Sequence, residues 1–509
     1  MTLLLLAVLA AEPMSARIDA RLKQAWAKHK ITPAAPATDA EFLRRATLDL
    51  VGTIPTRAEL EAHLASPDRK KAVARLLADP RFAAHQAQVW DQVLFGRDAP
   101  YELRDRTAFR AWLAGKFAKG AGLDAIAASL LKADEEGSEA FLAQFRSRSE
   151  DAAERVSRVF LGTQLQCARC HDHPFDPSLT QRDFFGMAGF LIRVVVHDPS
   201  GKDKRWRIGE KSTGEVLFDG SAKEARPGRK GVPIRPKFLG GKELDEPAVP
   251  KGFKEPKAGR DMPAPLFSRK AKLAEWVASA GNPFFARAMA NRVWGQLMGR
   301  GLVHPVDDFS IKNEPSLPAL LDDLAKGLIE RKFDLRGLMG EIVLSDAYAL
   351  SHKGASTEAL PRWHERAKVR PLSAEELLAS MRTATGFDAA GGKITGAIAE
   401  YMRMYMGKPT NGIGDFQAGL MEHLFVNNSG EVRDLARRRK GGLADELLTM
   451  KEEWPKRVDR LFLSVLSRLP SEKERARFVA YLTSEPKADA LVEEAIWVLL
   501  ASAEFRFQH

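Results

Sequence analysis

The sequence predicts a mainly α-helical protein in which a small β-rich insert separates two helical regions. Through most of the 509 residues, apolar side chains recur at intervals of three and four, the spacing of a helix with one buried face. Between about 193 and 263, glycine, proline and lysine become frequent, and short alternating runs at 205–208 and 215–218 are typical of strands. A chain of this length exceeds what one hydrophobic core supports, so we expect two or three domains.

The chain opens with an apolar run, residues 1–11, which is too short to cross a bilayer and ends in small residues. This run is similar to the hydrophobic part of a secretory signal, although it lacks the basic residues that usually come first. A buried first helix is the alternative. We expect export, and therefore an extracytoplasmic protein of the periplasm or cell envelope. No later stretch approaches transmembrane length, so we expect no transmembrane helix in the mature chain.

Residues 12–192 are predicted to form several helices. Asp39 is a suitable cap for a helix that ends before the Gly52–Pro55 break, and Thr56 can begin the next one. Ser149 is a suitable cap for the helix that leads into the cysteine motif described below.

Residues 264–509 return to a helical pattern. Asn282, directly before a proline, is a favourable start for a helix that Gly299 would end. Ser316 and Asp334 are expected to open two further helices.

The formal net charge of +11 raises the question of nucleic-acid binding. The basic residues are spread along the chain, however, and the densest cluster, 437–440, has no aromatic residues among them. We therefore predict no nucleic-acid partner and a solvated surface that favours an acidic partner or an anionic polymer of the envelope. Two cysteines cannot build a disulfide framework, so burial must stabilise the fold.

The most specific feature is the stretch 166–177, which contains the chain's only two cysteines. They are Cys167 and Cys170, and His171 directly follows the second. C-x-x-C-H is the spacing of covalent haem attachment, in which two thiols add to the vinyl groups of one porphyrin edge and the imidazole binds the iron. We therefore predict one covalent haem c, attached through both cysteines, with His171 as the proximal iron ligand.

Two other roles for the cysteines compete with haem. Zinc accepts mixed sulfur and nitrogen ligands, and Asp172 or His173 could complete a set begun by the two thiols and His171. Structural zinc usually draws a second ligand pair from a distant segment, and no other cysteine exists. A redox disulfide is the other role, but such motifs lie on a β-to-α turn of a parallel sheet, which this neighbourhood lacks.

The sixth ligand of the iron is not evident in the sequence. His173 is two residues from the proximal ligand, and two residues extend only about 7 Å, too little to carry the chain round a porphyrin. Met187 is a weak candidate, while Asp172 and His173 are expected to support the site. We therefore expect an iron that is five-coordinate or weakly capped.

Long stretches of this sequence resemble the planctomycete cytochrome-C-like family of large exported proteins. Residues 43–52 resemble the family's opening motif, and 167–190 resemble its cysteine and histidine motif with the aromatic-rich helix that follows. The family's second domain, of unknown function, is resembled by residues 282–287, 291–294, 299–303, 307–309, 457–470 and 500–505. The resemblance implies a cytochrome-like protein but supplies no reaction.

We accordingly expect four parts along the chain. They are a signal segment at 1–11, a helical cytochrome-like domain with the haem motif at 12–192, a β-rich insert or linker at 193–263, and a helical C-terminal domain of unknown function at 264–509.

Four polar residues of the last part could act together. Asn291 and Arg292, beside Asp307 and Asp308, would form either a buried polar network or a binding cleft. The network is favoured because no nucleophile with a matching base is evident. The sequence also shows no phosphate-binding loop, dinucleotide-binding turn or serine, histidine and aspartate in a catalytic order.

The sequence therefore predicts an exported c-type haem protein that acts in electron transfer or as the redox part of an extracytoplasmic enzyme. A haem-dependent oxidoreductase is the enzyme class that this would allow, with a redox protein as its partner. The alternative is a non-redox envelope scaffold or polymer-binding protein whose cysteine and histidine motif holds zinc.

Overall fold

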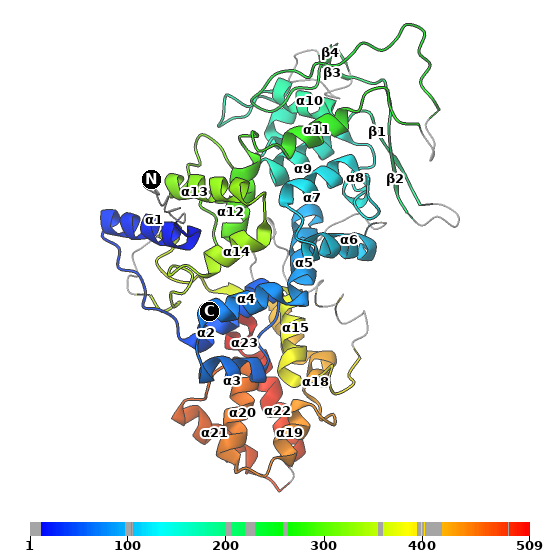
Figure 1. Cartoon of the computed structure of the whole chain (residues 1–509). Coiled ribbons are helices and arrows are strands. Elements are labelled where there is room, and N and C mark those ends of the chain that lie inside the picture. Colours follow the sequence, from blue (N-terminus) through cyan, green and yellow to red (C-terminus); the bar gives the residue numbers. More distant parts are fainter. Residues whose placement is uncertain are drawn as a thin grey trace, which may run out of the picture.

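The computed structural model describes residues 12–96, 103, 105–199, 205–218, 230–257, 263–354, 360–393, 399, 402, 420–486 and 488–508. Within these residues the chain is mainly α-helical, as predicted, and its strands form two-stranded antiparallel sheets (Figure 1). The segment 1–11, in which we expect a secretory signal, lies outside the described residues. A membrane crossing would need a longer or more apolar helix than any that these residues form.

The helices and strands follow the predicted order of helical region, insert and helical region. The first region contains α1 (Met14–His29), α2 (Asp39–Val51), α3 (Arg57–Ala65), α4 (Arg69–Ala78), α5 (Pro80–Phe95), α6 (Thr107–Ala118), α7 (Leu123–Lys132), α8 (Ala140–Ala143), α9 (Ser149–Phe160), the 3-10 turn η2 (Gln166–Arg169) and α10 (Gln181–Gly189). The insert contains β1 (Val194–His197), β2 (Arg207–Glu210), β3 (Val216–Phe218) and β4 (Val232–Ile234).

The second helical region runs to the end of the described chain. It contains α11 (Arg269–Val277), α12 (Phe285–Met298), α13 (Pro318–Glu330), α14 (Leu335–Val343), η3 (Pro361–Trp363), β5 (Arg370–Pro371), α15 (Ala374–Thr385), α17 (Leu420–Asn428), α18 (Gly430–Ala436), α19 (Leu443–Thr449), α20 (Trp454–Leu466), α21 (Glu472–Leu482), α22 (Ala488–Ala501), α23 (Ala503–Arg506) and β6 (Phe507–Gln508).

Polar caps fix the starts of the early helices, and two predicted caps were wrong. Thr38, not Asp39, caps α2, because Thr38 and Glu41 satisfy each other's backbone N–H groups in a capping box. Thr56 caps α3 in the same way, as predicted. Ser149 is the first residue of α9 and makes no capping bond, and its hydroxyl donates to the carboxylate of Glu150 at 3.0 Å instead.

The caps of the second helical region are also a mixture of confirmed and corrected predictions. Gly299 ends α12 with a φ of 70°, and Asp334 caps α14, both as predicted. Asn282 lies outside α12, but its Oδ1 accepts hydrogen bonds of 2.8 and 2.9 Å from two backbone amides at the start of that helix. Ser316 does not open α13, because the helix begins at Pro318, a residue type that suits the first turn.

The insert forms two antiparallel hairpin-like pairs, β1 with β2 and β3 with β4. The two predicted strand runs correspond to β2 and β3. Arg193, directly before β1, and Arg269, at the start of α11, are almost fully buried. Each forms ion pairs with both Glu215 and Glu246, and these pairs fasten the insert to the helices.

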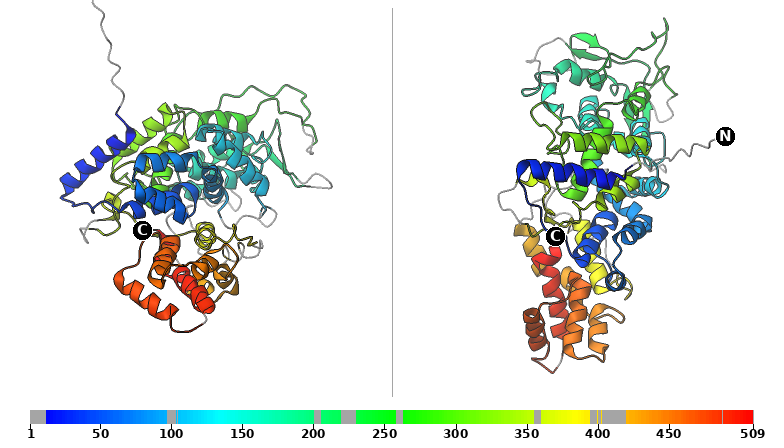
Figure 2. Two further views of the ribbon diagram at one scale, coloured as in Figure 1. Left: turned by 60° about the horizontal axis from the view of Figure 1, so that its bottom comes forward. Right: turned by 60° about the vertical axis from the view of Figure 1, so that its left-hand side comes forward.

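The buried apolar residues form two large cores. The first extends from Met14 to Leu350 and includes the helices on both sides of the insert. The second extends from Leu372 to Phe505 and also takes in two apolar residues from α2 and the turn after it. Figures 1 and 2 show the helices of the second core at one end of an elongated molecule and the insert near the other. The expected boundaries at 192 and 264 stay predictions.

A buried charge network joins the two cores. Asp49 of α2 accepts the hydroxyl of Tyr348 at 2.7 Å and the guanidinium of Arg370 at 3.0 Å. Arg370 also pairs with Glu376 of α15 at 2.8 Å. Burial alone would raise the pKa of Glu376, but the guanidinium of Arg370 outweighs it and lowers that pKa to about 2. Since β6 pairs with β5, the chain's last described residues are held at the same junction.

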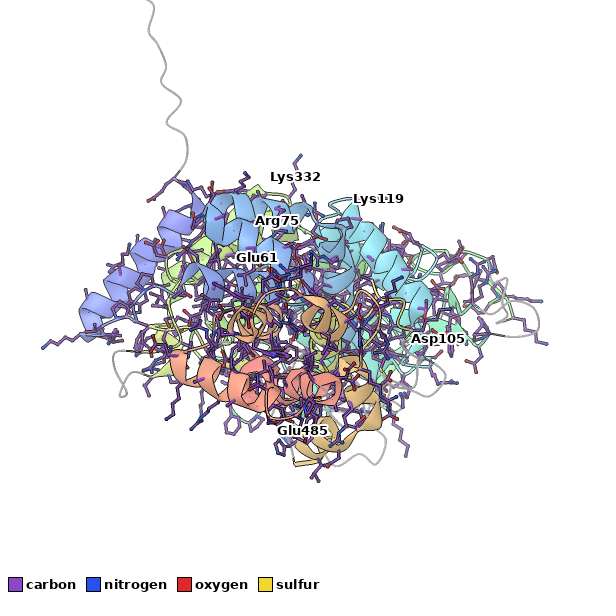
Figure 3. All side chains as sticks on the ribbon, turned by 90° about the horizontal axis from the view of Figure 1, so that it is seen from below. Glu61, Arg75, Asp105, Lys119, Lys332 and Glu485 are labelled. Atoms are coloured by element: carbon purple, nitrogen blue, oxygen red, sulfur yellow. The ribbon has the colours of Figure 1, made fainter. Side chains whose placement is uncertain are left out.

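Charged side chains of both signs lie around the molecule. In the view from below in Figure 3, Glu61 and Arg75 are on the opposite side from Glu485. Within the basic cluster 437–440, Arg438 forms ion pairs with two aspartates at 2.9 and 2.7 Å. Ion pairs within the protein therefore balance part of the positive charge of this cluster.

Candidate functional site

The cysteine motif lies in the connection between α9 and α10. Gly162 turns the chain with a φ of 66°, and a Cβ added there would lie 2.7 Å from the ring of Phe309. Glycine therefore satisfies both the left-handed backbone and the close packing. The backbone N–H of Phe309 also donates to the carbonyl oxygen of Gly162 at 2.8 Å, which ties this connection to the segment 301–313.

A backbone turn that begins in η2 links Cys167, Cys170 and His171. The carbonyl oxygen of Cys167 accepts the backbone N–H of Cys170 at 3.3 Å and that of His171 at 3.4 Å. Both thiols are free, Cys167 is half-buried, and Cys170 and His171 are exposed. Cys170 and His171 are therefore accessible at the surface, while Cys167 is partly covered.

The hydrogen bonds of His171 determine which of its nitrogens can bind a metal. Its Nδ1 lies 2.7 Å from the backbone carbonyl oxygen of Asp172. A carbonyl oxygen only accepts, so Nδ1 carries the hydrogen and Nε2 keeps a lone pair. The Oδ1 of Asp172 in turn accepts the first backbone N–H of α10, from Gln181, at 2.8 Å. Asp172 thus orients the imidazole and is itself fixed to a helix.

His173 has the opposite arrangement. Its Nδ1 accepts the backbone N–H groups of Phe175 and Asp176 at 3.3 and 3.1 Å. Two donors require the lone pair on Nδ1, so the hydrogen of the neutral ring is on Nε2. His173 therefore organises the loop and offers no lone pair at Nε2 for a metal.

Asp176 fastens the motif loop to the segment 301–313. Its Oδ1 accepts the backbone N–H and hydroxyl of Ser178 at 3.1 and 2.6 Å, and its Oδ2 accepts the backbone N–H of Ile311 at 3.4 Å. Burial opposes ionisation, but these hydrogen bonds hold the pKa of Asp176 below its ordinary value. Asp176 lies in the stretch 166–177 but received no predicted role, although an aspartate that bonds the backbone two residues later is typical of such a turn.

Two exposed apolar side chains lie where these segments meet. Phe175 is 59% exposed and Ile311 is 66% exposed. The ammonium group of Lys312 lies 5.2 Å from the centre of the Phe175 ring. Together they offer an apolar surface with an adjacent cation beside the motif.

The predicted polar network around Arg292 and Asp307 is present and includes partners from the motif side. Asp307 is buried, and it accepts the Nε of Arg158 at 2.7 Å and the amide of Gln164 at 3.2 Å. Arg292 donates to the backbone carbonyl of Arg158 at 3.4 Å. Burial lowers the pKa of Arg292, against the attraction of Asp307.

Asn291 and Asp308 lie beside these groups but form hydrogen bonds with other partners in the described structure. The amide group of Asn291 donates to the carbonyl oxygens of Val303 and Val306 at 2.9 and 3.1 Å, which shapes the segment before Asp308. Burial and the neighbouring Asp307 raise the pKa of Asp308, while His173 acts in the opposite direction. No nucleophile joins these groups, so the arrangement is that of a supporting network.

Arg158 and Gln164 were missed by sequence reasoning. They are 149 and 143 residues from Asp307 along the chain, and neither has a distinctive local spacing. The contacts of the Arg158 guanidinium and the Gln164 amide with Asp307 depend on the fold, which brings the segment 301–313 next to them.

The predicted ligand residues differ in whether they offer an atom that can bind a metal. In the part of the chain that the structure describes, no group of three or more histidine, cysteine, aspartate or glutamate side chains could hold a metal ion. His171 alone offers an oriented nitrogen at the motif. Met187, the weak candidate for a sixth ligand, is fully buried on α10 and stays a prediction.

Two family models match the chain in succession. PSCyt2, a protein of unknown function (DUF1549), matches residues 17–195, and PSD1, a protein of unknown function (DUF1553), matches residues 269–403. The chain belongs to the planctomycete cytochrome-C-like family. The motif loop lies in the first of the family's two domains and Asp307 in the second, so the contacts described above join them. Comparisons with curated proteins and with solved structures give no match.

Proposed function

We propose that this member of the family is an exported c-type haem protein, acting in electron transfer or as the redox part of an extracytoplasmic enzyme. The observation that supports this best is that one backbone turn links Cys167, Cys170 and His171, with Cys170 and His171 exposed. Covalent haem attachment needs two thiols and one imidazole on the same side of the chain. The lone pair on Nε2 of His171 meets the remaining requirement.

The roles of the chain's own residues follow from this arrangement. A bound haem supplies an iron that exchanges single electrons. Cys167 and Cys170 would hold the porphyrin edge, and Asp172 keeps His171 in the tautomer that can bind iron. Because Cys170 and His171 are exposed, a redox partner protein can approach the attachment site directly.

An extracytoplasmic location belongs to the same proposal. Covalent haem attachment in bacteria takes place outside the cytoplasm, and the apolar run at 1–11 has the composition of a secretory segment. The proposed location is the periplasm or cell envelope.

The alternative is an envelope scaffold or polymer-binding protein whose motif holds zinc. Zinc requires three or four protein donors to converge on one point, and the described residues contain no such group. Haem needs only one protein ligand on the proximal side and two thiols for attachment. The close sequence spacing of the two thiols and His171 therefore favours the haem proposal.

We expect protein matured with the haem-attachment machinery to keep its haem after denaturation. The thioether bonds are covalent, so a denaturing gel stained for haem peroxidase activity should show a coloured band. Replacing both cysteines (Cys167→Ala with Cys170→Ala) should abolish it. A colourless wild-type band with one zinc per chain by elemental analysis would support the scaffold instead.

The histidines provide a matched pair of variants for the same experiment. His171→Ala should change the iron spectrum of any haem that remains attached, because it removes the proximal ligand. His173→Gln should leave that spectrum unchanged, because a glutamine oxygen can accept the loop's backbone N–H groups. Equal spectral changes in both variants would contradict the assignment of His171.

A further inference from the structure

A cleft lined by residues from distant parts of the chain is separate from the cysteine motif. Its volume is about 910 Å³. It is lined by the first turns of α2, by His352 and Lys353, by the turn between α20 and α21, and by α23 with Phe507. It therefore lies between the opening motif of the family's first domain and C-terminal helices beyond residue 403, where the second family match ends.

Arg44 is an unusual lining residue because its charge is buried without a carboxylate partner. It is 2% exposed. Its terminal nitrogens donate to the carbonyl oxygen of Val465 at 3.4 Å, the hydroxyl of Ser467 at 3.3 Å and the carbonyl oxygen of Phe505 at 3.2 Å. Its Nε is buried and has no hydrogen-bond partner in the described structure.

These neutral acceptors do not balance the charge of the guanidinium. Burial lowers the pKa of Arg44 to about 10, so it is still a cation at neutral pH. A buried cation is usually paired with an anion, because removal from water costs several kcal/mol. The described protein provides no ion pair to Arg44.

The carboxylates that line the cleft are already occupied by other groups. Glu504 and Glu474 both pair with Arg468, at 2.5 and 2.8 Å. Glu41 accepts the backbone N–H and hydroxyl of Thr38 in the capping box of α2. Glu504 attracts Arg44 through space, but its carboxylate pairs with Arg468, and none of the three glutamates forms an ion pair with Arg44 in the described structure.

Further cations stand at the rim of the same cleft. Lys473 and Arg477 are one turn apart on α21, and both are exposed, as is Lys353. Five lysine and arginine side chains line the cleft against three glutamates, so its walls carry a positive excess. Apolar surface is contributed by Leu466, Phe507 and other residues between the charges.

We propose that this cleft binds a small organic anion, with its carboxylate or phosphate group turned to Arg44 and the rim cations. The apolar body of the ligand lies against Leu466 and Phe507. This site goes beyond the proposed haem function and does not depend on it.

The binding test uses simple probes on the full chain. Phenylacetate and phenyl phosphate represent the two kinds of anionic group, and phenylacetamide is the neutral control of the same shape. We expect isothermal titration calorimetry to show one site for at least one anion, with affinity that falls as sodium chloride rises. The phosphate and carboxylate arms identify which group is preferred. Equal binding of phenylacetamide, or no binding of either anion, would overturn the proposal.

Variants at the rim distinguish binding of the anion in this cleft from its general attraction to a positively charged protein. Lys473→Gln with Arg477→Gln should weaken the preferred anion by about fivefold, the effect of losing two partly exposed charge contacts. Lys70→Gln with Lys71→Gln on α4 removes the same charge from an exposed surface and should leave the affinity unchanged. Equal weakening in both double variants would overturn the site.

Arg44→Met tests the buried charge itself. Methionine keeps much of the apolar volume of the arginine side chain, so we expect the packing around it to be preserved. Circular dichroism checks that the variant is folded. We expect it to lose at least tenfold in affinity for the preferred anion. If this variant is unfolded, the rim variants still decide the proposal.

Discussion

At the scale of single residues, His171 and His173 differ through the backbone groups that they contact. The sequence could predict two histidines at a haem motif, and the distance argument already made His173 a poor sixth ligand. It could not predict their tautomers, because these depend on the carbonyl oxygen of Asp172 and on two later backbone N–H groups. The spacing thus indicates the type of chemistry, and the local fold decides which nitrogen can perform it.

We expect the sixth position of the haem iron to be open or weakly capped. His173 uses Nδ1 for backbone contacts, and Met187 is fully buried. Ferrous haem-loaded protein should therefore bind carbon monoxide rapidly with a large shift of the Soret band. Met187→Ala should bind it at a similar rate. A low-spin six-coordinate spectrum that resists carbon monoxide, and that the Met187→Ala change abolishes, would identify Met187 as the ligand and favour electron carriage.

At the scale of elements, helices were easier to predict than their first residues. The prediction that Thr56 begins α3 is confirmed, but the cap of α2 is Thr38 and not the predicted Asp39. The prediction that Ser316 opens α13 is wrong, because the helix begins at Pro318. These errors affect only the first residues of the helices. The apolar spacing predicts that a helix is present, whereas neighbouring polar residues determine at which residue it begins.

The turn after α9 is expected to be sensitive to a single methyl group. Gly162→Ala should lower the free energy of unfolding by about 2 to 4 kcal/mol, because alanine is strained at positive φ and its Cβ would clash with Phe309. Gly120→Ala is the matched control, with a φ of 69° and no atom within 4 Å of the added Cβ. It should cost only about 1 to 2 kcal/mol. Urea unfolding measures both, and equal losses would contradict the role of Phe309.

At the scale of the whole molecule, the two matched family domains share one core and one polar network. The sequence predicted that Arg292 and Asp307 could belong to one polar network, and it contains the C-x-x-C-H motif, whose haem stays a prediction. It could not predict that Arg158 would reach Asp307 from the motif side, because no local pattern links residues 149 positions apart. The cleft at Arg44 was missed for the same reason, since its walls come from distant parts of the chain.

Two buried histidines predict that the whole molecule loses stability in mild acid. Burial lowers the pKa of His85 to about 4 and that of His364 to about 3. The unfolded chain therefore takes up protons below about pH 6.5 that the folded chain refuses, so stability is full above that pH and falls towards pH 4. Each histidine contributes a slope of about 1.4 kcal/mol per pH unit at most.

Urea unfolding at pH 7.5, 6.5, 5.5 and 4.5 would measure this loss. The charged groups nearest to His85 do not remove the effect, because Glu376 favours its protonation while Arg370 opposes it. His85→Gln should reduce the acid slope by about half, whereas His29→Gln, at an exposed position of α1, should leave it unchanged. A free energy of unfolding that stays constant between pH 7.5 and 4.5 would show that both histidines can be protonated in the folded protein.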